Sequence, residues 1–132
     1  GTGSGFLTAC LARLGAGIRS IEIHPELLEF ARANLGRLSG PRIELEARDA
    51  FAAEPLGEYD AIALTGSMPV YDARFERALK VGGRLFAVVG VAPAMEAMLI
   101  RRTSSSEWVR ESLFETVIDP LIGAPAPAGF VF

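Results

Sequence analysis

Gly1-Thr2-Gly3-Ser4-Gly5-Phe6 opens the sequence and runs directly into a segment with helical periodicity. Glycine at every second position lets the backbone turn sharply and approach a ligand closely, because no Cβ stands in the way. Leu7, Leu11 and Leu14 then recur at helical spacing, which predicts a helix over residues 6–14. The loop therefore lies at a helix N-terminus, where unpaired N–H groups and the positive end of the helix dipole face whatever binds above it.

An acidic residue follows this loop at an informative distance. Glu22 lies seventeen residues after Gly5 and ends the short apolar-rich run 18–21. In Rossmann-like folds, an acidic residue about 20 residues after the loop, at the tip of the second strand, binds the ribose hydroxyls. The loop and Glu22 together predict a nucleoside-cofactor site, whereas the loop alone could be a tight turn without a ligand.

The spacing of the glycines narrows the cofactor. Dinucleotide-binding folds use G-x-G-x-x-G, in which the third glycine allows close packing of helix and strand around a pyrophosphate. Here the spacing is G-x-G-x-G, which is similar to motif I of S-adenosylmethionine-dependent methyltransferases. We therefore expect S-adenosylmethionine as the cofactor, with S-adenosylhomocysteine as its product, and the spacing disfavours a dinucleotide reductase.

Length and composition are those of one globular domain over residues 1–132. Half of the residues are hydrophobic and 22% are charged. No apolar run approaches the roughly 20 residues needed to span a bilayer, and the first segment lacks the features of a signal peptide. The formal net charge of −3 argues against nucleic acid as the main partner.

Cys10 is the single cysteine, which excludes an internal disulfide and favours a cytoplasmic location. It falls beside Leu7, Leu11 and Leu14 on the predicted helix, so we expect it to be buried as a small apolar side chain. One cysteine and one histidine are too few for a structural zinc site, and the sequence predicts no metal site.

The periodicities predict an α/β fold in which strands and helices alternate. The expected helices cover residues 6–14, 25–38 and 71–79, and the expected strands cover 18–22, 42–47, 59–65 and 84–90. An antiparallel pair over 95–102 and 108–118 and a coil over 120–132 follow. The breaks between elements are Gly15-Ala16-Gly17, Ser39-Gly40-Pro41, the loop with Pro55 and Gly57, and a turn over residues 80–83. This order predicts a doubly wound, mostly parallel, Rossmann-like sheet that binds ligands at the carboxyl ends of its strands.

Polar residues fall at three of these carboxyl ends. They are Glu22, Asp49 and the run Thr65-Gly66-Ser67. Asp49 is a candidate for the adenine edge, although loop aspartates also form turns with their own backbone. Strand 59–65 is almost continuously apolar, which predicts cover on both faces. Three aromatic residues are expected in the core: Phe75, Trp108 and Phe114.

Several motifs in chain order resemble the protein-L-isoaspartate O-methyltransferase family. Residues 1–6 with Thr8-Ala9 are similar to its G-T-G-S-G-Y-x-T-A signature, with Phe in place of Tyr. Ser20-Ile21-Glu22 followed by Pro25-Glu26-Leu27 is similar to its S-I-E-x-x-P-E-L segment. Residues 31–35 are similar to its A-R-x-N-L helix, and residues 81–85 to its P-G-G-R-L, with Val in place of Pro. The resemblance covers nearly the whole chain.

This resemblance implies a cytosolic repair enzyme that methylates the α-carboxylate of isoaspartyl residues in damaged proteins or peptides. The cofactor contacts that it implies are Gly1, Thr2, Gly3, Ser4, Gly5, Glu22, Ile23, Asp49, Ala50 and Thr65, and the substrate contacts are Gly66 and Ser67. No catalytic base is nominated, because a carboxylate nucleophile is already ionised at pH 7 and needs alignment and desolvation more than proton transfer.

The sequence departs from the family pattern in two places. It starts at motif I, so the strand that precedes this motif in the family, at the centre of the sheet, is absent. Two neighbouring strands would then have unpaired edges. We expect the chain to be part of a longer protein, or a second copy to supply the strand by self-association. Gly66-Ser67-Met68-Pro69 replaces the small residues typical of the family and indicates a divergent branch. Another methyl acceptor, or a cofactor-binding module without catalysis, therefore stays open.

Overall fold

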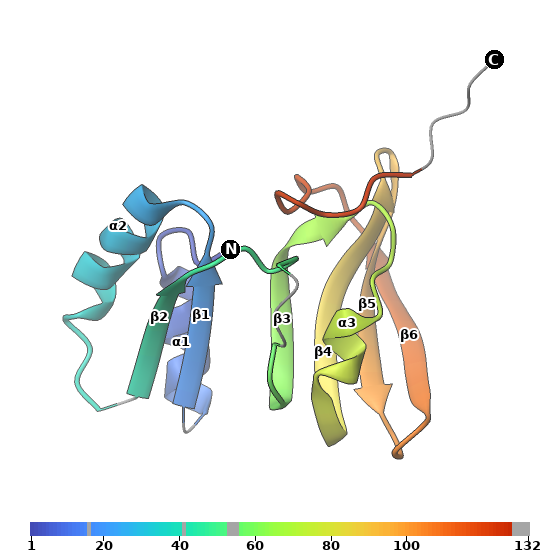
Figure 1. Ribbon diagram of the computed structural model, residues 1–132, viewed down its shortest axis with the longest axis horizontal. Coiled ribbons are helices and arrows are strands. Elements are labelled where there is room, and N and C mark those ends of the chain that lie inside the picture. Colours follow the sequence, from blue (N-terminus) through green and yellow to red (C-terminus); the bar gives the residue numbers. More distant parts are fainter. Residues whose placement is uncertain (16, 41, 53–55, 128–132) are drawn as a thin grey trace. The chain divides into compact units, whose positions relative to one another are not determined.

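The computed structural model describes residues 1–15, 17–40, 42–52 and 56–127 (Figure 1). The chain divides into two compact units, Gly1–Ala52 and Ala53–Phe132. That these units form one domain stays a prediction. The expected breaks at Ala16, Pro41 and Pro55, and the last part of the expected C-terminal coil, lie outside the described residues.

The first unit is a parallel β-α-β arrangement that begins with a helix. Its elements are α1 (Phe6–Leu14), β1 (Gly17–Glu22), α2 (Pro25–Leu35) and β2 (Arg42–Ala47). The two strands pair in parallel from Gly17 opposite Arg42 to Glu22 opposite Ala47. All four elements confirm the sequence prediction, except that α2 ends at Leu35 instead of residue 38. The Gly36 N–H closes that helix by donating to the Arg32 carbonyl at 2.9 Å.

Helix α1 buries a different face from the one that the leucine spacing predicts. Its buried residues are Thr8 and Ala12, whereas Leu14 is 86% exposed and Leu7 is 42% exposed. Cys10 is also exposed, so the expectation that it packs in the core is wrong. The helix buries small side chains, which allow a close approach to its neighbours, whereas Leu7 and Leu14 are exposed and Leu11 is only partly buried.

Helix α2 follows its predicted pattern. Its buried residues are Leu28, Ala31 and Leu35, which lie three and four positions apart on one face. Pro25 occupies the first turn, where its missing N–H has no helical partner to lose.

The second unit is a four-stranded mixed sheet with one short helix. Its elements are β3 (Tyr59–Met68), α3 (Arg74–Arg77), β4 (Leu79–Val91), β5 (Ala94–Arg102) and β6 (Trp108–Glu115). The strands lie side by side in the order β3-β4-β5-β6 (Figure 1). β3 and β4 are parallel, whereas β5 is antiparallel to both β4 and β6. The predicted antiparallel pair at the end of the chain is thus confirmed.

Two expected elements differ in extent. The helix predicted over residues 71–79 is a single turn, α3, although Phe75 and Leu79 are buried as expected. The turn predicted over residues 80–83 lies inside β4, where the pairing with β3 shifts register between Tyr59 and Ala61. Gly82, with φ +85°, lies in this bulge, so the glycine pair bends a strand instead of ending one.

Two further expectations about burial are wrong. Ala61, Ala63 and Thr65 of the edge strand β3 are exposed: they alternate with Ile62 and Leu64 and so share one face, which the described residues of this unit leave uncovered. Phe114 is 56% exposed because β6 is the other edge strand of this sheet. Trp108 is partly buried, and its indole N–H donates to the Glu76 carbonyl at 3.0 Å.

A buried carboxylate joins α3 to β6. Glu76 is only 5% exposed, and its two oxygens accept hydrogen bonds from the Arg110 guanidinium at 2.8 and 3.0 Å. The Tyr71 hydroxyl donates to the same carboxylate, and the Arg110 guanidinium lies over the Tyr71 ring. Burial and the neighbouring Glu76 raise the pKa of Tyr71 to about 12, so it stays protonated and keeps donating. Sequence periodicity gives no sign of this network.

The α/β fold class is confirmed, with parallel pairing in β1–β2 and β3–β4 and antiparallel pairing beyond β4. Among the residues that the structure describes, β1 forms a ladder only with β2, and β3 only with β4. A search of the same residues finds no helix with the length and hydropathy that crossing a bilayer requires.

We predict that Gly90→Ala destabilises the chain by at least about 2 kcal/mol. Gly90 has φ +121°, and a Cβ there would lie 2.3 Å from the Ala94 carbonyl oxygen and 3.2 Å from the Met95 Cα. These atoms belong to the paired strand β5 and cannot move independently. The free energy of unfolding in urea measures the effect.

Gly82→Ala is the matched control. Its φ of +85° is also unfavourable for alanine, but a Cβ there meets nothing within 4 Å. We expect a cost of about 1 kcal/mol from backbone strain alone. Equal losses for the two variants would contradict the steric account of Gly90.

Candidate functional site

The glycine-rich loop adopts a conformation that its glycines permit. Gly3 and Gly5 have φ values of +54° and +83°, in the left-handed region that side chains with a Cβ disfavour. The Gly5 N–H donates to the Thr2 carbonyl at 2.9 Å, which closes the loop just before α1 begins. Gly5 is the N-cap of α1 and supplies no side chain to its first turn, so the loop leaves a helix N-terminus without a side-chain cap.

The two glycines differ in what surrounds them. A Cβ on Gly3 would meet nothing within 4 Å, whereas a Cβ on Gly5 would lie 3.0 Å from the Leu35 side chain and 3.4 Å from Ala31. Gly5 therefore packs against α2. Next to the α-carbon of Gly3 the space is open, so a ligand can lie against the backbone there.

A chain of three hydroxyls fastens this loop to β1. The Thr2 hydroxyl donates to the Ile21 carbonyl at 3.0 Å and lies 2.8 Å from the Ser20 hydroxyl, which is 2.9 Å from the Thr8 hydroxyl. Because each hydroxyl has one proton, Ser20 donates to Thr2, and Thr8 donates to Ser20. Thr2 and Thr8 are both buried. The Thr2 side chain thus anchors the loop to β1. Its expected contact with the cofactor stays a prediction.

Glu22 lies at the carboxyl end of β1, directly beside the loop. It is 4% exposed; one carboxylate oxygen accepts from the Gly3 N–H at 3.0 Å and the other from the His24 N–H at 3.1 Å. Burial raises the pKa of this carboxyl, but the backbone hydrogen bonds from Gly3, His24 and Ile23 and the charge of the Gly1 amino group together lower it by more, so the pKa lies below its ordinary value. Glu22 is therefore ionised at neutral pH and oriented by two backbone donors.

The end of β2 lies next to the end of β1. Glu22 pairs with Ala47, and the Arg48 N–H donates to the Glu22 carbonyl at 2.9 Å. The next residue, Asp49, accepts from the Phe51 N–H at 2.8 Å through its own carboxylate. Asp49 therefore forms the local turn with its own backbone that the sequence offers as the alternative to contact with adenine. Contact of Asp49 and of the partly buried Ala50 with adenine stays a prediction.

The other residues of the first unit that are predicted to contact the cofactor are Gly1 and Ser4, in the glycine loop, and Ile23, directly after β1. Ser4 is exposed, and its carbonyl accepts from the Asn34 side-chain amide at 2.9 Å. Ile23 follows Glu22 and is 37% exposed. The Gly1 amino group donates to the Ile21 carbonyl at 3.0 Å. The structure therefore gathers Gly1–Gly5, Glu22 and Ile23 around one strand end.

In the second unit, the tip of β3 is covered by a later part of the chain. Ser67 is 1% exposed; its N–H donates to the Asp119 carbonyl at 2.9 Å, and its carbonyl accepts from the Leu121 N–H at 3.0 Å. Its hydroxyl donates to the Ile118 carbonyl at 3.1 Å. A Cβ on Gly66 would lie 2.9 Å from the Leu121 side chain. Residues 118–121 thus require a glycine at position 66.

This cover bears on the residues predicted at the β3 tip. Gly66 and Ser67 are buried and occupied by contacts within the chain, whereas Thr65 is exposed. Cofactor contact at Thr65 and substrate contact at Gly66 and Ser67 stay predictions. The coil expected from residue 120 onward gives no signal in the sequence for the parallel bridge between Ser67 and Pro120.

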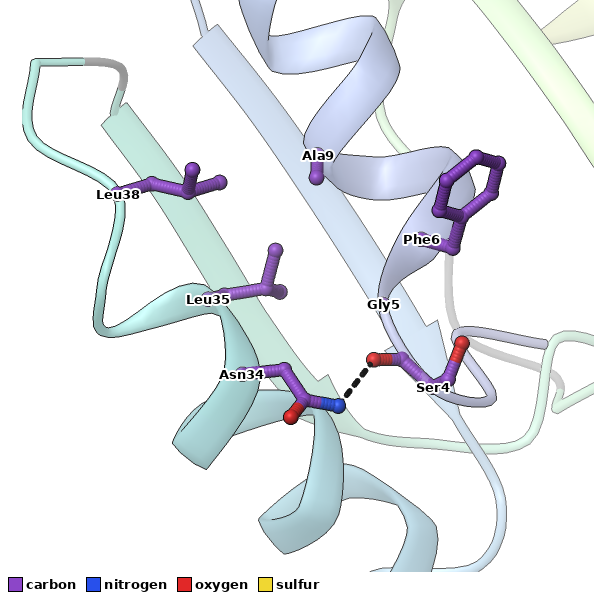
Figure 2. Close-up of a pocket in the computed structure, with 7 residues that line it drawn as sticks. All are labelled: Ser4, Gly5, Phe6, Ala9, Asn34, Leu35 and Leu38. Atoms are coloured by element: carbon purple, nitrogen blue, oxygen red, sulfur yellow. Dashed lines mark hydrogen bonds between the residues drawn. The ribbon is translucent and has the colours of Figure 1, made fainter.

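Beside the glycine loop, the first unit contains a mostly apolar cavity of about 270 Å³ between α1 and α2. Figure 2 shows its seven lining residues: Ser4, Gly5, Phe6, Ala9, Asn34, Leu35 and Leu38. The loop contributes backbone to this cavity, and α2 contributes the Asn34 amide that reaches the Ser4 carbonyl. Across the described ranges, no group of three or more His, Cys, Asp or Glu side chains could hold a metal ion.

We predict that Glu22→Gln lowers the free energy of unfolding by about 1–3 kcal/mol at pH 7, because an amide replaces a charged acceptor of two backbone hydrogen bonds. A carboxyl with a depressed folded-state pKa stabilises the chain above its unfolded pKa, about 4.5, and this contribution is lost as the pH falls through the folded value. The difference between the Glu22→Gln variant and wild type should therefore shrink below pH 4.5. Urea unfolding at several pH values measures it.

Glu29→Gln is the control, because the Glu29 side chain is 70% exposed on α2. We expect that variant to differ little from wild type at any pH. A loss in Glu22→Gln that stays constant from pH 7 to pH 3 would contradict the assignment of the depressed pKa to Glu22.

Comparison with solved structures supports the fold. A structure from Plasmodium falciparum, assigned as a protein-L-isoaspartate O-methyltransferase and in complex with S-adenosyl-L-homocysteine, superposes with a TM-score of 0.80. The alignment covers 92% of this chain and 62% of that one, at 20% identity. A second protein-L-isoaspartate O-methyltransferase structure gives the same TM-score at 23% identity, covering 96% of this chain and 41% of its own. At these identities the likeness confirms the Rossmann-like methyltransferase fold.

Sequence comparison identifies the family. Protein-L-isoaspartate O-methyltransferase 2 of Marinobacter nauticus is 35% identical over 93% of this chain, and protein-L-isoaspartate O-methyltransferase 1 of Geotalea uraniireducens is 34% identical over 94%. The chain spans 57% and 58% of the length of these two relatives. The family model described as protein-L-isoaspartate(D-aspartate) O-methyltransferase matches residues 1–124. With nearly its whole length matched, the chain belongs to the protein-L-isoaspartate O-methyltransferase family.

Proposed function

We propose that this chain binds S-adenosylmethionine and forms the cofactor-binding part of a methyltransferase that acts on isoaspartyl carboxylates in damaged proteins. The observation that carries the proposal is the Glu22 carboxylate, buried and ionised beside the open face of the glycine loop. Family membership and the S-adenosylhomocysteine complex of the Plasmodium falciparum structure support the same cofactor.

The residues present fit this cofactor. The space above Gly3 admits a group lying flat on the backbone, and the carboxylate of Glu22 is an acceptor for two neighbouring ribose hydroxyls. Gly1–Gly5 would hold the methionine and ribose parts, and Asp49 with Ala50, at the adjacent strand end, the adenine edge. An ionised acceptor in a buried setting favours a neutral diol over a phosphate, which agrees with a cofactor that lacks phosphate.

Bound S-adenosylmethionine would supply an electrophilic methyl group on its sulfonium. In the proposed reaction, a carboxylate oxygen of the acceptor forms the new C–O bond as the C–S bond breaks, which leaves S-adenosylhomocysteine. The acceptor is already ionised, so the chain's own residues need to bind, orient and exclude water, and no proton is moved. The sheet edge that carries Glu22 and the loop performs the binding and orienting part.

The partner in this proposal is a protein or peptide that contains isoaspartyl residues, and the location is the cytoplasm. A different methyl acceptor and a cofactor-binding module without catalysis are the alternatives. Self-association through the one-sided strands β1 and β3 is a further prediction, for which the mass of the chain in solution is the test.

Calorimetric titration with S-adenosylhomocysteine tests the cofactor assignment. We expect one-to-one binding, and we expect Glu22→Ala to weaken it more than tenfold, at least about 1.4 kcal/mol, because the ribose hydroxyls lose their acceptor. Glu29→Ala on the exposed face of α2 is the control and should bind as wild type does. Unchanged affinity in Glu22→Ala would overturn the ribose assignment.

Two peptides of identical sequence, one with isoaspartate and one with aspartate, test the acceptor when they are given to the full-length protein. With S-adenosylmethionine labelled at its methyl group, we expect label in the isoaspartyl peptide only, because only that linkage presents the abnormal α-carboxylate. Label in both peptides would indicate another acceptor. Label in neither, from a chain that binds S-adenosylhomocysteine, would favour a binding module.

A further inference from the structure

One face of α2 packs against the glycine loop and forms a hydrogen bond with it. Ala31, Asn34 and Leu35 lie three and four positions apart, so they project from the same face of that helix. Ala31 and Leu35 fill the space next to the α-carbon of Gly5, and Asn34 donates to the Ser4 carbonyl. Figure 2 shows the Asn34 amide reaching the loop directly (dashed line).

The peptide group between Ser4 and Gly5 is thereby held at both ends. Its carbonyl accepts from Asn34 at 2.9 Å, and its N–H donates to the Thr2 carbonyl at 2.9 Å. The carbonyl and N–H of one peptide group are rigidly opposed, because the peptide bond is planar. Rotating this group would break both hydrogen bonds at once. A loop of glycines offers little other resistance to such a rotation.

The stability of α2 does not explain why position 34 is an asparagine. Asparagine has lower helix propensity than alanine, and its side chain is exposed on the surface of α2. A position with no role beyond the helix would gain from alanine. Asn34 provides a side-chain amide that donates a hydrogen bond to the carbonyl of Ser4, 30 positions earlier in the sequence.

We propose that Asn34 is a positioning residue for the cofactor loop: its amide fixes the orientation of the Ser4–Gly5 peptide group, so that the loop is preorganised for its ligand. The inference rests on the proposed S-adenosylmethionine site. Asn34 itself touches no ligand in this account. It acts through the backbone that the ligand contacts, and removing it makes binding carry the cost of ordering the loop.

Amide hydrogen exchange of the ligand-free chain, followed residue by residue by NMR, is the first test. In Asn34→Ala we expect the Gly5 N–H to exchange about fivefold faster, the loss of one ordinary hydrogen bond. The Leu28 N–H, bonded to the His24 carbonyl inside α2, should exchange as in wild type. A Gly5 rate that is unchanged, or that rises together with the Leu28 rate, would overturn the proposal.

The Asn34→Asp variant separates the effect of the hydrogen bond that Asn34 donates from the effect of the size of its side chain. Aspartate has the same shape but cannot donate when ionised, and its charge would oppose the Ser4 carbonyl. We expect Gly5 exchange at least as fast as in Asn34→Ala. An Asn34→Asp chain with the wild-type Gly5 rate would show that shape alone holds the loop, against the proposal.

Titration with S-adenosylhomocysteine then connects the loop to binding. We expect Asn34→Ala to weaken binding about fivefold, and the control Arg32→Ala, an exposed change on the same helix, to leave it unchanged. Faster Gly5 exchange without weaker binding would overturn the positioning role. If the unsubstituted chain failed to bind S-adenosylhomocysteine, the proposed function would fall, whereas the Gly5 exchange rate would still decide whether Asn34 holds the loop.

Discussion

A loop with glycine at every second position cannot hold its own shape, because it has few side chains to pack and a backbone that rotates easily. In this chain the loop is held from three directions. Thr2 binds it to β1 through hydroxyls, Glu22 accepts from the Gly3 N–H, and α2 covers Gly5. The rest of the first unit supports these contacts: the parallel pairing places Glu22 at the right strand end, and the capped end of α2 keeps its last turn against the loop.

The same carboxylate serves the structure and the proposed chemistry. The Glu22 oxygens that hold the loop through the Gly3 and His24 N–H groups are also the ones that would accept from a ribose. An acceptor oxygen has two lone pairs, so one oxygen can keep a backbone donor and still receive a hydroxyl. The carboxylate can therefore keep its backbone donors and accept from a ribose at the same time.

The sequence predicts the order of the helices and strands more reliably than it predicts which faces they bury and what covers their ends. The glycine loop, Glu22 and the helix and strand order follow from local chemistry and periodicity, which a single sequence records. The face of α1 that is buried does not follow from such patterns, because its buried residues are Thr8, whose hydroxyl is hydrogen-bonded to the Ser20 hydroxyl, and the small Ala12, and not the leucines. Asn34 belongs to one of the family-like motifs, but only the fold brings it to Ser4. The cover of the β3 tip by residues 118–121 and the Glu76–Arg110 pair join positions too distant in sequence for any pattern to reveal.

The closure of β3 by residues 118–121 sets an order of events during synthesis. The first unit, Gly1–Ala52, makes the contacts around its loop within its own residues, so it can begin to form while later residues are still being added. The backbone of Ser67, in contrast, waits for Asp119 and Leu121, more than 50 residues later. Until those residues emerge from the ribosome, the tip of β3 exposes unpaired N–H and C=O groups at a strand end. A chain cut before residue 118 would lack all three groups that the backbone and hydroxyl of Ser67 bond in residues 118–121.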